Sequence, residues 1–258
     1  MRTLIAIPVY NEERYVERVL TRVLARPEVT DVLAIDDGSS DATPSLLARF
    51  PVDVIRHSVN RGYGRSMQDA FSWAALRGFD WVITMDCDEQ HEPDSIPAFL
   101  DRIRAGKADV VSGSRYMNLA VGVGTPPADR RAINQQITEE LNRRLGSRLG
   151  VRLTDAFCGF KAYRVSRVGE LPLTEDGYAF PMQFWVQCAA MGLRVEELPV
   201  RLIYNDPTRT FGGPLNDPGT RLRHYREVLE QEMQRWAARL GNAAVHPCCC
   251  GASRCESA

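Results

Sequence analysis

The sequence lacks a long apolar run. No stretch approaches the ~20 apolar residues of a membrane-spanning helix. Thr3–Val9 is apolar, but it is too short for the core of a signal peptide and charged residues follow it closely. We therefore expect a soluble protein of the cytoplasm without a transmembrane segment, and leave open a peripheral contact with the inner face of the membrane.

The chain also lacks an excess of charge. Lysines and arginines nearly balance aspartates and glutamates over the 258 residues, so the formal net charge is -1. A general basic field is therefore missing, and we expect no binding to nucleic acid. Basic residues must act locally, where a few arginines meet.

Cysteine is not arranged as a disulfide framework or a zinc finger. Cys87, Cys158 and Cys188 are scattered, as expected for buried thiols in a reducing compartment. The other four crowd the C-terminal end, and their adjacent positions do not match zinc-finger spacing: Cys248, Cys249, Cys250 and Cys255. Residues 241–258 have no periodicity, and we predict that they form a disordered tail.

The first half of the chain alternates short apolar runs with amphipathic stretches. The runs predict strands at Thr3–Val9, Asp31–Asp36, Val52–Arg56, Trp81–Met85 and Ala108–Ser112. The stretches between them predict helices at Glu12–Ala25, Ala42–Arg49, Arg65–Arg77 and Asp94–Ala105. This alternation predicts an α/β fold with a mostly parallel central sheet flanked by helices. Ligands of such sheets bind beyond the carboxyl ends of the strands.

The second half is less regular. It predicts helices at Arg130–Leu145 and Phe180–Met191, strands at Phe160–Arg164 and Val195–Tyr204, and a long loop at Asn205–Gly219. Thr220–Leu240 predicts a C-terminal amphipathic helix, which we expect to pack on its own domain rather than to anchor the protein to a membrane. We predict one domain, residues 1–240, with a nucleotide-sugar half at 1–115 and an acceptor half at 116–240.

Paired carboxylates provide the strongest chemical signal. Asp86 and Asp88 directly follow a predicted strand, and their spacing places both carboxylates on one side of an extended chain. Oxygen ligands of this kind suit Mg²⁺ or Mn²⁺, and the Gln90 carbonyl offers a third oxygen. The alternative interpretation of these residues is a solvated acidic turn.

Three further polar motifs follow the other early strands. In Pro8-Val9-Tyr10-Asn11-Glu12, Tyr10 can stack on a base, and Asn11 and Glu12 can bond base or ribose edges; the alternative is a helix start with Asn11 as N-cap. After the second strand, Asp37 is the ligand candidate and Asp41 the helix cap. Asn60-Arg61-Gly62-Tyr63-Gly64 before a helix suits either an anion or a simple turn.

These motifs together resemble family 2 glycosyltransferases of the GT-A fold, and within them the dolichyl-phosphate mannosyltransferase-like group. The resemblance covers roughly residues 1 to 213. Besides the motifs above, it rests on Asp86-x-Asp88-x-Gln90-His91-x-Pro93, Gly113-Ser114-Arg115, Asp155-x-x-x-Gly159-Phe160 and Leu198-Pro199-Val200. It implies a nucleotide-diphosphosugar transferase fold, a divalent metal, and transfer of a hexose with inversion at the anomeric carbon.

The resemblance also implies roles for individual residues. The nucleoside pocket would contain Pro8, Tyr10, Asn11, Glu12, Ile35 and Asp37. Asp86, Asp88 and Gln90 would hold the metal, with Cys87 beside the donor and Asp88 acting in catalysis. Three arginines would bind phosphate: Arg115 at the donor, Arg131 at the acceptor, and Arg209 on a loop that closes over the diphosphate.

The donor, GDP- or UDP-linked, and the acceptor remain open at this point. A lipid phosphate such as a polyprenyl phosphate is already ionised, whereas a hydroxyl acceptor requires a general base. The candidates for that base are Asp155, Asp176 and His91, with Asp155 preferred because its motif lies on the acceptor side. Two other functions are alternatives: a sugar-1-phosphate nucleotidyltransferase and a non-catalytic sugar-nucleotide-binding protein.

Overall fold

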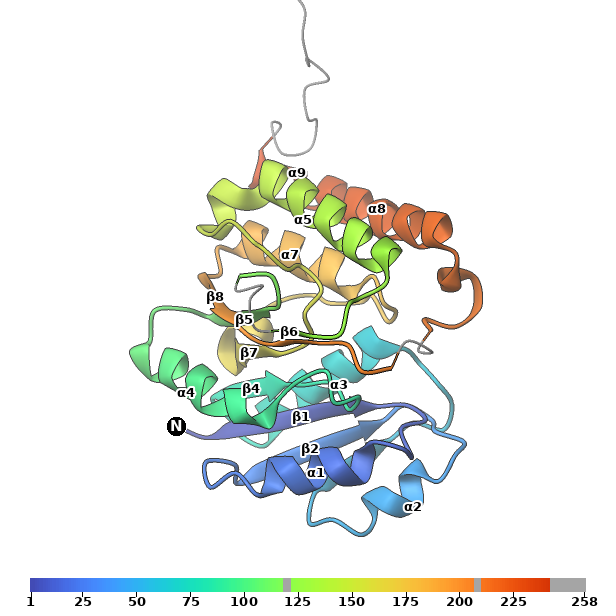
Figure 1. Ribbon diagram of the computed structural model, residues 1–258. Helices are drawn as coiled ribbons and strands as arrows, with labels where there is room; N and C mark the ends of the chain where they lie inside the picture. The colour runs from blue at the N-terminus through green and yellow to red at the C-terminus, as the bar shows by residue number, and fades with distance from the viewer. Residues whose placement is uncertain (118–121, 207–209, 242–258) are drawn as a thin grey trace, which may run out of the picture.

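The computed structural model describes residues 1–117, 122–206 and 210–241. A seven-stranded sheet runs through the middle of the described part, with strands in the order β3-β2-β1-β4-β7-β5-β8 (Figure 1). The strands are β1 (Thr3–Val9), β2 (Asp31–Asp36), β3 (Asp53–Arg56), β4 (Trp81–Thr84), β5 (Val110–Ser114), β7 (Lys161–Arg164) and β8 (Val195–Pro199). Only β7 among them pairs antiparallel with its neighbours, which confirms the mostly parallel sheet.

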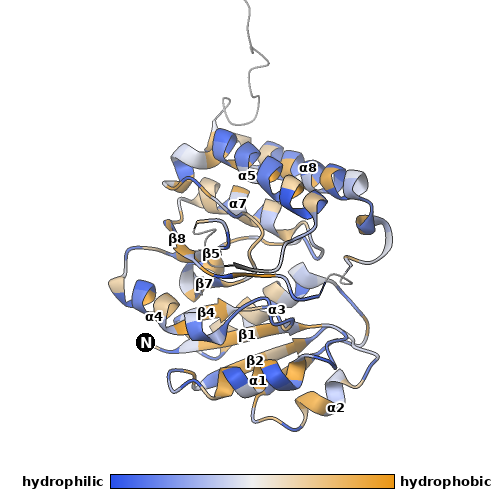
Figure 2. Cartoon of the chain, in the orientation of Figure 1, coloured by the Kyte–Doolittle hydropathy of each residue, from blue (hydrophilic) through white to orange (hydrophobic). Residues whose placement is uncertain are grey.

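Helices cover both faces of this sheet. One face packs against α1 (Val16–Leu24), α2 (Thr43–Leu47) and α4 (Ile96–Ala105), the last preceded by the short 3-10 helix η1 (Pro93–Ser95). The other face packs against α3 (Tyr63–Leu76), α6 (Val165–Val168) and α7 (Phe180–Met191). Figure 2 shows hydrophobic residues along the central strands and mixed colouring on the outer helices, as expected for a sheet buried between two layers.

The second half adds an outer layer over α7. Two long helices, α5 (Ala128–Leu149) and α8 (Pro218–Arg235), lie side by side there and run in the same direction (Figure 1). The short α9 (Ala237–Leu240) follows α8. Tyr225, Leu229 and Met233 of α8 are buried in the same hydrophobic cluster as α5 and α7. No helix among the described ranges is both long enough and apolar enough to cross a bilayer.

Two predicted helices and one predicted strand differ from the structure in where they begin or in being interrupted. The helix predicted at Glu12–Ala25 begins only at Val16, because Asn11 has a φ of 54° and Glu12–Tyr15 forms a turn. The strand predicted at Val195–Tyr204 is two strands: β8 ends where its partner β5 ends, and β9 (Leu202–Ile203) pairs instead with β6 (Gly122–Val123). The predicted C-terminal helix is interrupted at Trp236, between α8 and α9.

The loop predicted at Asn205–Gly219 is shorter in the structure. It contains a 3-10 helix, η2 (Gly213–Asn216), and α8 already begins at Pro218. The Asp217 carboxylate accepts a hydrogen bond from the Thr220 amide at 2.7 Å and so caps the helix. Proline at the first helical position and an aspartate before it are helix-start signals that the sequence contains.

Candidate active site

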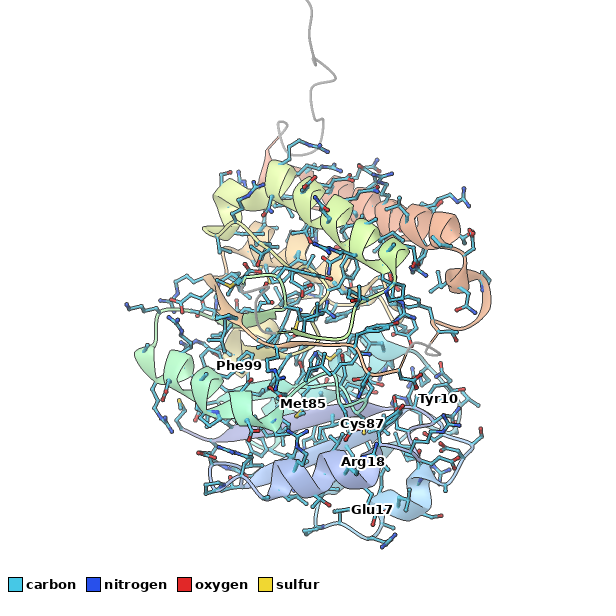
Figure 3. All side chains as sticks on the ribbon, in the orientation of Figure 1. Tyr10, Glu17, Arg18, Met85, Cys87 and Phe99 are labelled. Carbon is cyan, nitrogen blue, oxygen red and sulfur yellow. The ribbon has the colours of Figure 1, made fainter. Side chains whose placement is uncertain are left out.

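A cleft of about 630 Å³ opens beyond the carboxyl ends of β1, β2, β4 and β5. Residues at the ends of these strands or just beyond them line it: Pro8, Tyr10, Glu12, Asp37, Asp86, Cys87, Asp88, Gln90 and Arg115. In Figure 3, Tyr10 and Cys87 lie toward this end of the sheet, away from Phe99. Four polar motifs that are far apart in the sequence therefore meet at one edge of the sheet, as parallel strands require.

The turn after β4 presents the paired carboxylates. The Asp86 side chain is 37% exposed, whereas Asp88 is 7% exposed and accepts a hydrogen bond from the Gln90 amide at 3.1 Å. Glu89, with a φ of 61°, points its carboxylate at Arg18, which donates two hydrogen bonds of 3.0 and 2.8 Å. Arg18 thus holds the turn that carries both aspartates.

The donor set of this turn suits a hard divalent cation. Asp86, Asp88 and Gln90 all line the cleft, and they offer carboxylate and amide oxygens. Within the described ranges, no group of three or more His, Cys, Asp and Glu side chains is placed to hold a metal ion. Mg²⁺ and Mn²⁺ are commonly held by one or two carboxylates, with substrate phosphates completing the shell. Two aspartates and a glutamine fit a site of this kind, in which substrate phosphates supply the remaining ligands.

Gly159 makes room for the Asp86 carboxylate. A Cβ atom at position 159 would lie 2.6 Å from Oδ1 and 2.7 Å from Oδ2 of Asp86. Such contacts are closer than any atoms tolerate, so a larger residue must displace the carboxylate. The glycine of the Asp155-x-x-x-Gly159 motif is therefore explained by the residue that faces it.

We expect Gly159→Ala to lower glycosyl transfer about a hundredfold, because shifting a reacting constellation by about an ångström has effects of this size. Initial rates at saturating donor and a range of MnCl₂ concentrations would measure it. Gly146→Ala is the matched control, since a Cβ there meets no atom within 4 Å. Wild-type rates for Gly159→Ala would show that the Asp86 position is not critical.

One end of the cleft is formed by the segments after β1 and β2. Pro8, Tyr10 and Glu12 line it, and the Tyr10 ring is 46% exposed and open to stacking. Asn11 is placed differently: its Oδ1 accepts from the Ser40 amide at 2.9 Å, so it joins the two segments rather than lining the cleft. It does not cap α1, whose first residue is Val16.

Of the two residues predicted at the end of β2, Asp37 lines the cleft and Ile35 does not. The Ile35 side chain is fully buried between the sheet and α3 and does not line the cleft. The Asp37 carboxylate does line it. It accepts from the amides of Arg61 and Gly62 at 2.8 Å each, so it also holds the loop that begins at Asn60.

The glycines of Asn60-x-Gly62-x-Gly64 serve packing against backbone. A Cβ at Gly62 would lie 2.3 Å from the Asp176 carbonyl oxygen, and one at Gly64 would lie 2.1 Å from that of Glu175. The Arg65 amide, at the start of α3, donates to the Asp176 carbonyl at 3.1 Å. The amides of Arg61, Gly62 and Arg65 are thus bonded within the chain, and binding of an anion by this loop stays a prediction.

Arg115 lines the cleft from a buried ion pair. Its guanidinium donates to both oxygens of Asp155, at 2.6 and 3.0 Å, and the Asn134 amide donates to Asp155 at 2.8 Å. Burial alone would raise the pKa of the Asp155 carboxyl, but the charge and hydrogen bonds of Arg115 outweigh it, so this pKa lies well below its usual range. Asp155 is completely buried and holds Arg115 in place.

None of the three candidates for a general base lines the cleft. Asp155 is buried and ion-paired, so it is not placed to take a proton from an acceptor. His91 is buried as well; burial lowers its pKa to about 4, and its Nδ1 accepts from the Asp86 amide at 2.9 Å. Asp176 is exposed and accepts from the Gln68 side chain at 3.3 Å. The carboxylates among the described lining residues are those of Glu12, Asp37, Asp86 and Asp88.

On α5 the structure brings Arg130, rather than Arg131, to the cleft. Arg131 is exposed and does not line it, whereas Arg130 shares a helix face with Ile133 and Asn134, which also line it. Neighbouring helix positions point about 100° apart, so an error of one residue changes the face. Arg209, the third predicted arginine, lies outside the described residues.

Aromatic residues line the cleft on the side of α5 and α8, and most of them were not predicted from the sequence. The Phe211 ring lies under two guanidinium groups, 4.7 Å from that of Arg130 and 4.4 Å from that of Arg221. It also meets the Tyr178 ring edge-on at 5.4 Å, and Tyr178 stacks on Tyr63 at 6.3 Å. These five residues come from five separate places in the chain, so no local sequence pattern groups them.

Residues 4–171 match the model of the family described as glycosyl transferase family 2. The chain belongs to this family and is a glycosyltransferase, which excludes the nucleotidyltransferase and the non-catalytic binding protein. The GT-A fold predicted from the motifs is confirmed by solved structures of similar fold.

The chain is 32% identical over 211 residues to an undecaprenyl-phosphate mannosyltransferase of Micrococcus luteus, covering 79% of this chain and 84% of the relative. It is 30% identical to a polyprenol monophosphomannose synthase of Mycolicibacterium smegmatis, and the match covers 77% of this chain and 76% of the relative. Its fold is similar to glucosyl-3-phosphoglycerate synthase of Mycobacterium tuberculosis, solved with Mn²⁺ and UDP, with a TM-score of 0.69, 18% identity, and 90% and 79% of the two chains covered.

Proposed function

We propose that this enzyme transfers a hexose, with inversion, from a nucleotide diphosphate sugar to the phosphate of a polyprenyl phosphate. The observation that carries the proposal is the composition of the cleft: a pair of aspartates after β4 and three arginines line it, and its other two carboxylates lie at the end that we assign to the nucleoside. The names of the two relatives, an undecaprenyl-phosphate mannosyltransferase and a polyprenol monophosphomannose synthase, support the same acceptor.

The donor occupies the half of the cleft built from β1, β2 and β4. Its base stacks on Tyr10, and Asp37 and Glu12 accept hydrogen bonds from base or ribose. Asp86, Asp88 and Gln90 would hold a divalent metal, which when bound supplies positive charge that stabilises the leaving diphosphate. Arg115, kept rigid by Asp155, presents its guanidinium to the same phosphates.

The acceptor enters from the side of α5, α7 and α8. A phosphate oxygen attacks the anomeric carbon on the face opposite the diphosphate, the new carbon–oxygen bond forms, and the bond to the nucleoside diphosphate breaks. This nucleophile is already ionised, so no base is required. Arg130, which lines the cleft beside Tyr204 and Phe211, provides a positive charge for the acceptor phosphate.

Transfer assays with purified protein test this proposal. GDP-mannose, GDP-glucose, UDP-glucose and dTDP-glucose would each be incubated with undecaprenyl phosphate, with MnCl₂ or with EDTA, and the lipid product quantified. We expect a sugar-phosphate lipid from one donor, in MnCl₂ only. Undecaprenol is the matched acceptor without phosphate, and equal transfer to it would contradict the proposed nucleophile.

We expect Asp37→Ala to weaken nucleotide binding about tenfold or more, because a buried hydrogen-bonding carboxylate is lost. Titration calorimetry with GDP and UDP in MnCl₂ would measure the dissociation constants, and the MnCl₂ requirement should be unchanged. Asp31→Ala, at the other end of β2, is the control. Wild-type affinity in Asp37→Ala would place the nucleoside elsewhere.

A further inference from the structure

His57 connects the Asp37 carboxylate at the cleft to a second carboxylate on α3. Its Nδ1 lies 2.6 Å from Asp37 Oδ1, and its Nε2 lies 2.8 Å from Asp69 Oδ2. The side chains of His57 and Asp37 are each 6% exposed and that of Asp69 is 16% exposed. These contacts are therefore largely shielded from water, and hydrogen bonds are stronger in the protein interior than in water.

Both ring nitrogens of His57 are engaged at once. One contacts a carboxylate oxygen on the loop after β2, and the other contacts a carboxylate oxygen on α3. The ring therefore cannot rotate without losing both contacts, and it spans the gap between the two carboxylates.

Arg65 holds Asp69 at the far end. It donates to Asp69 through Nε at 3.1 Å and through Nη2 at 2.7 Å, one helical turn away on α3. The carboxylate that clamps the ring is thus itself fixed by two hydrogen bonds. The His57 amide also donates to the Asp36 carbonyl at 2.9 Å, which fixes the backbone beside the strand that leads to Asp37.

From this arrangement we propose that His57 is a positioning residue for the donor: clamped by Asp69, it fixes the orientation of the Asp37 carboxylate that receives the nucleoside. The inference rests on the proposed function, since it assumes that the nucleoside binds at Asp37. Asp37 also accepts from the Arg61 and Gly62 amides, so three donors converge on one carboxylate and leave it little freedom to rotate.

Nucleotide titration of variants tests this role. The wild-type protein is first titrated with GDP, UDP and dTDP in MnCl₂, and the tightest of these is used for the variants. His57→Gln, which keeps one donor but cannot bridge two carboxylates, should bind about tenfold more weakly. Asp69→Asn, which leaves the ring and its shape in place, should bind more weakly in the same direction. In transfer assays both should raise the donor KM and leave kcat within about twofold.

A double variant separates positioning from a general structural effect. If His57 acts through Asp37, adding His57→Gln to Asp37→Ala should cause no further loss of affinity. Asp101→Asn is the control for Asp69→Asn, since each aspartate pairs with an arginine one turn away on its own helix, but Asp101 contacts no histidine. Melting temperatures of all variants show whether they are folded.

The possible results are distinct. Unchanged nucleotide affinity in both His57→Gln and Asp69→Asn would overturn this inference while leaving the proposed function intact. A full additional loss from His57→Gln in the Asp37→Ala background would also overturn it, because the residue would then act on something other than Asp37. Absence of any nucleotide binding by the wild-type protein would overturn the proposed function and this inference together.

Discussion

Asp88→Ala is expected to reduce glycosyl transfer by about a thousandfold or more. In the proposed site this carboxylate would help to hold a divalent cation, and the cation would stabilise the negative charge on the leaving diphosphate by several kcal/mol in the transition state. Asp88 is nearly buried, lines the cleft and orders the turn through the Gln90 amide. Initial rates with GDP- and UDP-sugars over a range of MnCl₂ concentrations would measure the effect, with circular dichroism to verify the fold.

Two controls make this result specific. Asp94→Ala removes an exposed carboxylate from η1, which follows the turn that carries Asp88. Asp94 pairs with Arg22 and Arg26 there, and this variant should keep wild-type turnover. Wild-type protein in EDTA should lose activity as Asp88→Ala does, and regain it when MnCl₂ is added. Turnover that survives both the substitution and EDTA would rule out the metal site at Asp86 and Asp88.

The second large effect is expected from Asp155→Asn. This substitution leaves the Arg115 guanidinium, whose side chain is 17% exposed, without its charge partner. Removing one member of a buried ion pair typically costs about 3 kcal/mol or more, so urea unfolding should show a free energy of unfolding lower by about that amount. Turnover should also fall strongly, because Arg115 is no longer held toward the phosphates.

A double variant distinguishes the two consequences. Arg115→Met with Asp155→Leu removes both charges, and such replacements often restore stability. We expect the double variant to regain most of the free energy of unfolding but none of the turnover. Recovery of turnover along with stability would mean that the pair serves the fold alone.

Asp109→Asn is the matched control for this pair. Asp109 is also buried and accepts hydrogen bonds from two arginines, Arg164 and Arg194, but it does not line the cleft. We expect it to lower stability while the turnover of folded protein stays near that of the wild type. Equal loss of turnover in Asp109→Asn would show that the effect of Asp155→Asn comes through stability.

Much of the donor half could be predicted from sequence, because its signals are local. A Val- and Ile-rich run followed by a polar motif predicts a strand end, and parallel strands place their carboxyl ends together. Asp37, Asp86, Asp88 and Gln90 were thus placed at one cleft from sequence, and all four line it. Asn11 and Ile35 belong to the same motifs but do not line the cleft, because a strand motif includes residues that face the core or a neighbouring loop.

The acceptor half depends on contacts between distant segments. Whether Arg130 or Arg131 faces the cleft depends on the rotation of α5, which its packing against α7 and α8 determines. The role of Asp155 depends in the same way on its neighbours: the sequence allowed a base, and the ion pair with Arg115 makes it a support. Neither fact has a local signature.

The strand–helix alternation, the edge of the sheet where the motifs meet and the family could all be predicted from the sequence alone. Three facts required the folded structure: which side chains face the cleft, that Gly159 makes room for Asp86, and that His57 joins Asp37 to Asp69. The difference lies in the distance along the chain over which each interaction acts. Hydrophobic periodicity and turn chemistry act between residues a few positions apart, whereas burial, ion pairing and close backbone contacts arise only when distant segments have packed together.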